Sequence, residues 1–285
     1  MVSRSKITFI GPGMMAEAMI AGLIRQGMTT ADHLTAAGPT QDRLDQLEQQ
    51  YGIRTLSNNS EAAQGADIVV LSVKPQRLEK VLGNLRGAIA PTALVLSIVA
   101  GAKMEKISQG LNHDHIVRSM PNTPAQIGEG ITVWTASPTV NEEQRNAARQ
   151  ILSALGEEIF VEEENYLDMA TALSGTGPAY VFLFMEAMVD AGVHLGFPRR
   201  IAERLVTQTV RGSVNYYEKR EDHVHLAWLR NQVTSPGGTS AAALYYLEKA
   251  GFRTAISRAI WAAYERSQEL GKGGKTRPPE RSSNE

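Results

Sequence analysis

The first half of this chain of 285 residues alternates short apolar segments with segments of helical periodicity. Apolar segments that are rich in β-branched residues and almost continuous in hydrophobicity are typical of strands buried on both faces of a sheet. Their alternation with helices favours a doubly wound α/β fold with a mostly parallel sheet. The predicted strands are residues 6–11, 33–38, 67–73, 93–101, 115–121 and 130–137, and the predicted helices are 14–26, 41–51, 76–85 and 142–155.

The pattern changes after about residue 164, beyond which no strand is predicted. Helical spacing predicts helices over residues 177–195, 199–218, 241–250 and 252–270. The first of these is apolar around most of its circumference, as in a helix that is buried on all sides or lies in a subunit interface. Because the second half is small, we expect an interface. The predicted organisation is an α/β domain (1–164), an all-α domain that forms a homodimer (165–271) and a disordered polar tail (272–285).

Charge and composition exclude several classes of function. The formal net charge of −1 argues against nucleic-acid binding, which usually requires a basic excess. The absence of cysteine excludes disulfides and thiolate chemistry, and no cluster of metal ligands is evident, so we expect no metal. No uninterrupted apolar run reaches the roughly 20 residues that span a bilayer, and the N-terminus leads directly into a strand pattern. We therefore expect a soluble cytoplasmic protein that does not bind a membrane.

A G-x-G-x-x-A motif, formed by Gly11, Gly13 and Ala16, connects the first predicted strand to the first predicted helix. In this context the first glycine makes a tight turn and the second lets a pyrophosphate approach the backbone. The small third residue lets the helix pack on the strand. The motif predicts a Rossmann-type domain that binds a dinucleotide. The alternative is a glycine turn that only permits packing.

The end of the second predicted strand indicates which dinucleotide binds. Enzymes that use NAD usually carry an Asp or Glu there, which binds the ribose hydroxyls. Here residues 36–40 read AAGPT, and Asp32 lies before the strand. Without a carboxylate a 2′-phosphate is not repelled, and Thr40 or Arg43 could contact it, so NADPH is favoured over NADH. Arg43 could equally be a solvated helix residue.

Four further segments carry unusual residues at strand ends or helix starts. LSVKPQ (71–76) and RSMPNTP (118–124) end predicted strands, and ligands of open α/β sheets lie beyond the carboxyl ends of the strands. LSGTGPAY (173–180) and TSPGGTSAA (234–242) precede helices, where glycines let backbone N–H groups converge on an anion. The alternatives are prolines that only terminate strands, and tight turns capped by Ser or Thr.

No set of His, Asp and Ser residues with catalytic spacing is evident. We interpret all six histidines as structural or solvated: His33, His113, His115, His194, His223 and His225. Chemistry that needs no protein nucleophile is therefore favoured. Hydride transfer to an already protonated substrate is of this kind, because the cofactor supplies the reacting group and the protein supplies orientation and electrostatics.

The chain resembles the Δ1-pyrroline-5-carboxylate reductase family, which catalyses the last step of proline biosynthesis. The resemblance extends over nearly the whole chain and rests on FIGPGMMAEAM, LSVKPQ, RSMPNTP, LSGTGPAY, GFPRR, VTSPGGTS and LEKAGFR. It implies NAD(P)H-dependent reduction of a C=N bond to give L-proline. It also implies a Rossmann domain followed by a helical domain that builds a dimer, in some members assembled further into decamers.

The resemblance also implies roles for particular residues. The pyrophosphate would lie on Ile10, Gly11, Pro12, Gly13, Met14 and Met15. The rest of the cofactor would lie near Gly38, Thr40, Asn59, Ser72, Val73, Lys74, Pro75, Val99 and Ala100. The substrate would lie on Ser235, Gly237, Gly238, Thr239 and Ser240. There, backbone N–H groups hold the substrate carboxylate, and the hydroxyl of Ser240, with Thr239 beside it, bonds the ring nitrogen.

Three positions depart from the family pattern. Ser240 stands where members usually have Thr, and Met14 replaces the more usual Asn or Gln. Gly38 stands where some members place a Ser that contacts the adenosine ribose. These departures leave open a related cyclic imino acid as the substrate. A non-catalytic dimer that binds nucleotides is the alternative from a different class of function.

Overall fold

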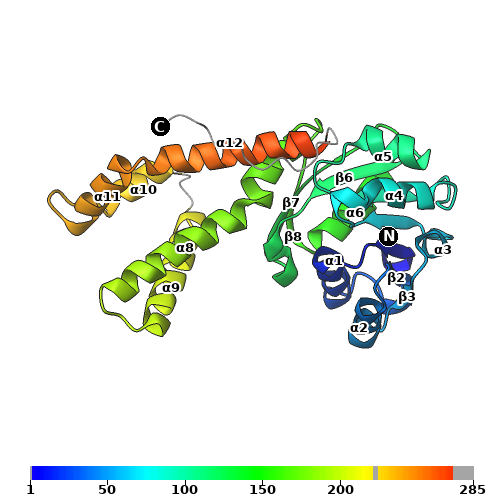
Figure 1. Cartoon of the computed structure of the whole chain (residues 1–285), viewed down its shortest axis with the longest axis horizontal. Coiled ribbons are helices and arrows are strands. Elements are labelled where there is room, and N and C mark those ends of the chain that lie inside the picture. Colours follow the sequence, from blue (N-terminus) through cyan, green and yellow to red (C-terminus); the bar gives the residue numbers. More distant parts are fainter. Residues whose placement is uncertain (1, 221–223, 272–285) are drawn as a thin grey trace. The chain divides into compact units, whose positions relative to one another are not determined.

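The computed structural model describes residues 2–220 and 224–271 (Figure 1). These residues form two compact units. The α/β unit holds the residues up to Thr176 and those from Ala262 onward, and the helical unit is Gly177–Trp261. The predicted boundary at residue 164 falls before this division, and the predicted tail, 272–285, lies outside the described residues.

The described part of the α/β unit contains an eight-stranded sheet in the order β3-β2-β1-β4-β5-β6-β7-β8. Neighbouring strands are parallel except β6 and β7, which are antiparallel. The first six positions of this order are those of doubly wound folds that bind dinucleotides. The strands are β1 (Ile7–Ile10), β2 (Leu34–Ala37), β3 (Arg54–Leu56), β4 (Ile68–Leu71), β5 (Leu94–Ser97), β6 (Ile116–Met120), β7 (Gly130–Ala136) and β8 (Gly156–Phe160).

Helices cover both faces of the sheet, and alternate strand residues enter two separate cores. On β1, Ile7 and Phe9 pack in the core under α1, α2 and α6, whereas Ile10 packs in the core under α3, α4 and α5. The helices of this unit are α1 (Met14–Arg25), α2 (Gln41–Tyr51), α3 (Asn59–Ala63), α4 (Pro75–Leu85), α5 (Met104–Leu111), α6 (Glu142–Ser153) and α7 (Tyr166–Ala170). A π-helical turn, Thr171–Gly175, follows α7.

The predicted doubly wound fold is confirmed, and each of the six predicted strands contains an observed strand. Two edge strands were not predicted. Strand β3 has three residues and none of them is buried, and β8 alternates half-buried and exposed residues in the sequence GEEIF. Edge strands of this kind lack the continuous apolar run that identified the central strands.

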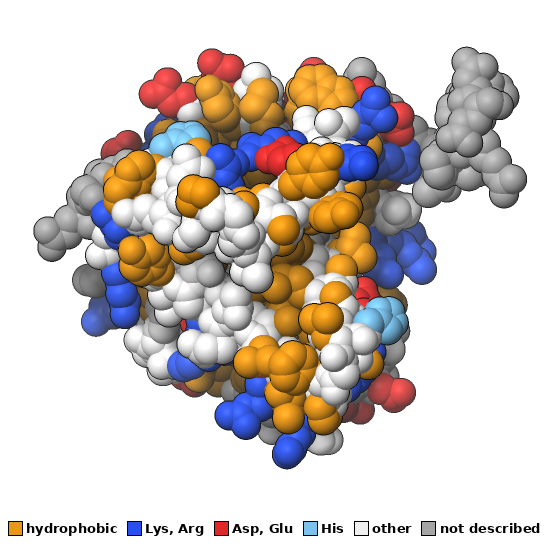
Figure 2. All heavy atoms as spheres, turned by 90° about the vertical axis from the view of Figure 1, so that its left-hand side faces the viewer, with side chains coloured by type: hydrophobic (Ala, Val, Ile, Leu, Met, Phe, Trp, Pro, Cys, Tyr) orange, Lys and Arg blue, Asp and Glu red, His pale blue; other side chains and the backbone are white. Residues whose placement is uncertain are grey.

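The helical unit has few buried residues of its own. It contains α8 (Gly177–His194), α9 (Arg199–Glu218), α10 (Leu226–Gln232), α11 (Thr239–Lys249) and the first half of α12 (Phe252–Gly271). Its core is a small cluster around Val189, Ala202 and Val206, where α8 packs on α9. Large apolar side chains are exposed on all five of these helices, for example Phe182, Leu205, Trp228, Tyr246 and Phe252. Figure 2, viewed from the end that carries α9, α10 and α11, shows many such side chains at the surface.

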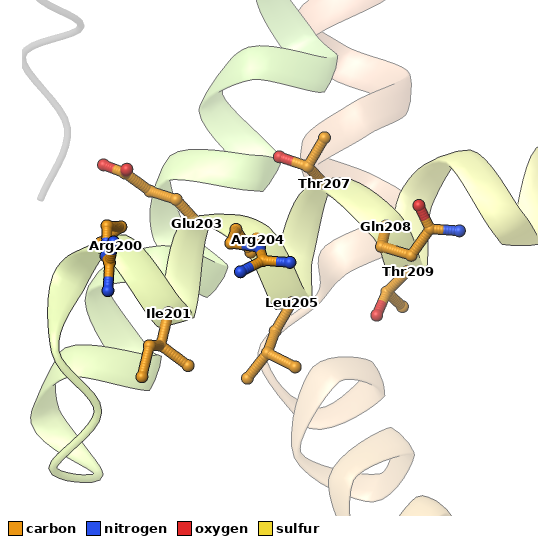
Figure 3. A pocket seen from close by; sticks show the side chains of 8 residues that line it. All are labelled: Arg200, Ile201, Glu203, Arg204, Leu205, Thr207, Gln208 and Thr209. Carbon is orange, nitrogen blue, oxygen red and sulfur yellow. The ribbon is translucent and has the colours of Figure 1, made fainter.

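Two surface features belong to this helical region. The helical run Tyr166–His194 is long and apolar enough to cross a membrane by length and composition, but these two criteria alone are weak evidence of a membrane span. A shallow hollow of about 790 Å³ lies along α9, where Ile201 and Leu205 point the same way from successive turns (Figure 3). Its lining combines apolar, charged and hydroxyl side chains of α9 without a buried ionisable group.

A buried ion-pair network joins distant parts of the α/β unit. Arg118 on β6 donates to Glu164 Oε1 at 2.9 Å and to Asp168 Oδ1 at 3.0 Å, and its side chain is 3% exposed. The same Asp168 oxygen accepts from Ser267 Oγ of α12 at 3.0 Å. The backbone N–H of Met104, which begins α5, donates to Glu164 at 2.7 Å. Through the two carboxylates that it binds, the Arg118 guanidinium thus links β6 to α5, α7 and the end of α12.

Removing this guanidinium should destabilise the α/β unit strongly. Arg118→Leu leaves two carboxylates with no cation in a mostly buried site, which costs about 3–5 kcal/mol of the free energy of unfolding. The control Lys106→Gln breaks an exposed ion pair with Glu79 at 2.8 Å and should cost less than about 1 kcal/mol. Urea unfolding at one fixed protein concentration measures both. Equal shifts for the two variants would contradict the assigned role of the network.

Candidate functional site

The turn between β1 and α1 is built on two glycines with different requirements. Gly11 has φ +98°, and a Cβ there would come within 2.6 Å of Val73 Cγ1 and 3.0 Å of the Ser72 carbonyl. Only glycine fits this position. A Cβ at Gly13 would meet no heavy atom within 4 Å. The first glycine is therefore required by the fold, and the second leaves open space in front of the helix.

The first turn of α1 presents unused backbone donors to that space. Gly13 is the N-cap and offers no side chain, and the first helical hydrogen bond runs from Glu17 N to Gly13 O at 3.0 Å. The N–H groups of Met14, Met15 and Ala16 precede it. Together with the helix dipole they favour an anion at this point.

Ser72 fastens the end of β4 to the glycine turn. Its Oγ lies 2.8 Å from Gly11 O and 3.1 Å from Ile10 O, and its backbone N–H donates to Ile10 O at 2.9 Å. Lys74 follows as the exposed N-cap of α4, with Pro75 in the first position of the helix. Ser72 therefore supports the turn, and its hydroxyl is already engaged by backbone carbonyls.

Arg43 is held by groups of the protein itself. Its Nε donates to Pro12 O at 2.8 Å, its Nη1 donates to Gln46 at 2.8 Å, and its Nη2 forms an ion pair with Glu17. Tyr51 OH also donates to Glu17, at 3.0 Å. Burial and this hydrogen bond raise the pKa of Tyr51 above its ordinary value. The charge of the Arg43 guanidinium is thus balanced by Glu17, and its hydrogen bond to Pro12 O positions the glycine turn.

Gly38, at the end of β2, has no room for a side chain. A Cβ there would come within 2.8 Å of Pro12 Cγ and still closer to Pro12 Cδ. Thr40, two residues further on, is the N-cap of α2, and its side chain makes no capping hydrogen bond. The segment that follows β2 therefore offers a ligand backbone groups and the Thr40 hydroxyl.

A cavity of about 170 Å³ lies beyond the carboxyl ends of β1, β2, β3 and β4. It brings together four residues that the sequence placed at the cofactor, namely Gly11, Gly38, Asn59 and Val73. The Oδ1 atom of Asn59 is buried without a hydrogen-bond partner, so it is available to a ligand donor. The other residues of the lining are Pro39, Ser57, Arg77, Lys80, Val81 and Asn84.

Sequence reasoning missed the two cations of this cavity, Arg77 and Lys80. They follow LSVKP by a few residues and share one face of α4, a spacing that also fits a solvated helix surface. The predicted residues Val99 and Ala100 follow β5 at the same edge of the sheet, but neither lines this cavity. Val99 is buried, and its N–H lies 3.3 Å from Ser97 Oγ.

The glycine junction before α11 has the same uncapped form as the turn before α1. Gly237 has φ +71°, and Gly238 is an N-cap with no side chain to bond the helix. The first helical bond runs from Ala242 N to Gly238 O at 3.2 Å, so the N–H groups of Thr239, Ser240 and Ala241 precede it. This end of α11 can therefore hold an anion, and two hydroxyls stand in its first turn.

The junction before α8 differs, because its hydroxyls are used within the chain. Thr176 Oγ1 donates to Thr171 O at 2.8 Å, and Ser174 Oγ donates to Ala170 O at 3.0 Å, around the π-helical turn. Gly175 lies against the end of β6, since a Cβ there would come within 2.8 Å of Met120 Cε. The segments RSMPNTP and LSGTGP, which are far apart in sequence, are thus neighbours.

The histidines near the strand starts lie at the opposite edge of the sheet. His113 is buried with Nε2 at 2.8 Å from Ala93 O, and His115 Nδ1 lies 3.0 Å from Thr139 O. Burial lowers the pKa of His113 below its ordinary value. Within the described ranges, no group of three or more acidic or histidine side chains is arranged to hold a metal ion.

Family models match both parts of the chain. The model described as "Pyrroline-5-carboxylate reductase dimerisation" matches residues 164–270. The model described as "NADP oxidoreductase coenzyme F420-dependent" matches residues 6–101, which contain the glycine turn and all the residues that line the cavity.

Relatives of known name match over nearly the whole length. A pyrroline-5-carboxylate reductase of Synechocystis is 43% identical, covering 94% of this chain and 98% of the relative. One of Pseudomonas aeruginosa is 40% identical with the same coverage. Among solved structures, the Plasmodium falciparum pyrroline carboxylate reductase with NADP bound superposes with a TM-score of 0.87 at 33% identity, covering 95% of this chain and 100% of that one. The glycine turn before α1 and the uncapped start of α11 are both open to an anion, which is consistent with this likeness along both units. The chain belongs to the pyrroline-5-carboxylate reductase family.

Proposed function

We propose that this protein reduces the C=N bond of 1-pyrroline-5-carboxylate to give L-proline. It would act as a soluble cytoplasmic homodimer that takes NADPH in preference to NADH. The observation that carries the proposal is the match, over 94% of the chain, to a curated relative of that name. The glycine turn before α1 lies in the segment 6–101 and the junction before α11 in the segment 164–270, and each segment is matched by a family model.

The residues of the α/β unit fit a nicotinamide dinucleotide. The open space at Gly13 and the free N–H groups of the first turn of α1 suit the pyrophosphate, and the unpartnered Asn59 Oδ1 suits a ribose hydroxyl. When bound, the cofactor supplies the hydride that reduces the C=N bond. The absence of a carboxylate from residues 36–40 supports NADPH over NADH.

The start of α11 fits the substrate carboxylate. The N–H groups of Thr239, Ser240 and Ala241 and the positive end of the helix dipole would hold it. The hydroxyl of Ser240, which is half-buried, would accept a hydrogen bond from the N–H of the ring nitrogen. Both contacts favour the iminium cation, which accepts hydride at carbon and keeps its proton on nitrogen. These residues orient the ring and stabilise its charge, and no proton needs to be abstracted.

A direct test measures the loss of NADPH absorbance, and separately of NADH absorbance, when 1-pyrroline-5-carboxylate is added to purified protein. We expect rapid oxidation of NADPH, slower oxidation of NADH, and formation of L-proline. A six-membered cyclic imino acid serves as the comparison substrate. Equal or faster turnover of the larger ring would move the assignment to that substrate, with Ser240 as the reason. Folded protein that binds NADPH but turns over neither ring would defeat both assignments.

Gly13→Ala should separate cofactor binding from folding. The backbone at Gly13 has φ −79°, which alanine adopts readily, and the added methyl meets no protein atom within 4 Å. The free energy of unfolding should change by about 0.5 kcal/mol or less. NADPH binding, measured by calorimetry, should weaken by about fivefold to 150-fold, because a well-packed site loses 1–3 kcal/mol when overfilled. Gly83→Ala, at an exposed position of α4 where a Cβ meets nothing within 4 Å, is the control and should leave binding unchanged. Unaltered binding by the first variant would place the pyrophosphate elsewhere.

Ser240→Ala should slow turnover without affecting NADPH affinity. Loss of a hydrogen bond to a charged group costs roughly 1.5–3 kcal/mol, or about tenfold to 150-fold in rate. Ser240→Thr restores the hydroxyl and should restore most of the rate. Steady-state kinetics and calorimetry measure the two quantities. An unchanged rate for Ser240→Ala, together with a reduced rate for Thr239→Ala, would transfer the role to Thr239.

A further inference from the structure

We infer that Arg77 and Lys80 of α4 form the subsite for the 2′-phosphate of NADPH and so set its preference over NADH. The inference rests on the proposed function, because it assumes that a nicotinamide dinucleotide binds at the glycine turn. It concerns residues of this chain that none of its recognised motifs contains.

The position of the two cations matches the adenosine end of a dinucleotide. They line the same cavity as Gly38, which follows β2, and Asn59, which begins α3. In doubly wound folds the ribose of the adenosine lies at the end of the second strand, where an arginine nearby can accommodate a 2′-phosphate. Their separation by three residues places both on one face of the helix.

Both cations lack a counter-ion in the part of the chain that the structure describes. No hydrogen bond or ion pair of the Arg77 or Lys80 side chain is found there, whereas Glu79 between them pairs with Lys106 at 2.8 Å. The cavity lining contains no carboxylate. The cavity therefore has no anionic side chain to balance Arg77 and Lys80, and it also contains the unpartnered Asn59 Oδ1. A ribose 2′-phosphate with a free 3′-hydroxyl supplies two anionic oxygens and a donor, which are the complementary groups.

Two other positions near the end of β2 cannot supply a charged phosphate contact, and Thr40 offers only a neutral hydroxyl. The Pro12 ring occupies the space where a side chain at position 38 would lie, so no hydroxyl can be presented from that residue. Arg43 is paired with Glu17, and this carboxylate beside it disfavours a second anion. The positive charge at this end of the cavity therefore comes from α4.

The test compares four ligands with and without the 2′-phosphate, namely NADPH, NADH, 2′,5′-ADP and 5′-AMP. Their binding is measured by calorimetry on full-length Arg77→Gln, Lys80→Gln, the double variant and the wild type. Each single variant should weaken binding of NADPH and 2′,5′-ADP about tenfold. Binding of NADH and 5′-AMP should change less than about twofold, since these ligands have no group at the subsite. The control, Arg86→Gln, removes the same charge from the far end of α4, outside the cavity, and should change neither pair.

The outcomes separate this inference from the proposed function. Equal losses for ligands with and without the 2′-phosphate, or no loss in the double variant, would overturn the subsite. So would equal affinity of the wild type for 2′,5′-ADP and 5′-AMP. The fragment assays require no imine, so selective losses would support the subsite even in a protein that fails to reduce 1-pyrroline-5-carboxylate. Arg77→Lys should recover part of the 2′,5′-ADP affinity, which a merely structural role for Arg77 would not predict.

Discussion

The site of the α/β unit depends on one backbone conformation, the positive φ of Gly11. Because Gly11 has no Cβ, the ends of β1 and β4 can approach closely enough for Ser72 to hydrogen-bond two carbonyls of the turn. The N–H of Gly11 also donates to Ala37 O at 2.9 Å, which brings in the end of β2. Three strand ends therefore converge at one point, and the cavity, the open space at Gly13 and the start of α1 are arranged around it.

Local placement of charge matters more here than the overall balance. The formal net charge of the chain is −1, yet its arginines and lysines have very different surroundings. Arg118 is buried between two carboxylates and holds the fold, and Arg43 is paired with Glu17 and holds the turn. Arg77 and Lys80 face a cavity lined without a carboxylate. Cations whose charge is balanced within the protein contribute stability, and those left unbalanced in a cavity are the ones that can bind a ligand.

Sequence reasoning predicted features that depend on local pattern. The six central strands have continuous apolar runs, and the turn before α1 has a spacing of glycines that few other structures require. Strand β3 and helix α5 were not predicted because they are short. Strand β8 was not predicted because it is an edge strand in which polar residues interrupt the apolar ones. The pairing of Arg43 with Glu17, and the lining of one cavity by both Arg77 and Gly38, depend on the placement of residues far apart in sequence. The periodicity of apolar residues along the chain gives no information on contacts between residues far apart in sequence.

The packing of Pro12 on Gly38 makes the two positions epistatic. A serine at position 38, which some family members carry, cannot be introduced while the proline ring fills the space beside it. In an evolutionary path between the two arrangements, the proline must be lost before the serine is gained, since the reverse order passes through a clashing intermediate. Glycine at position 38 is compatible with proline at position 12 and also with a smaller residue there. A change at position 12 therefore has to precede any gain of a side chain at position 38.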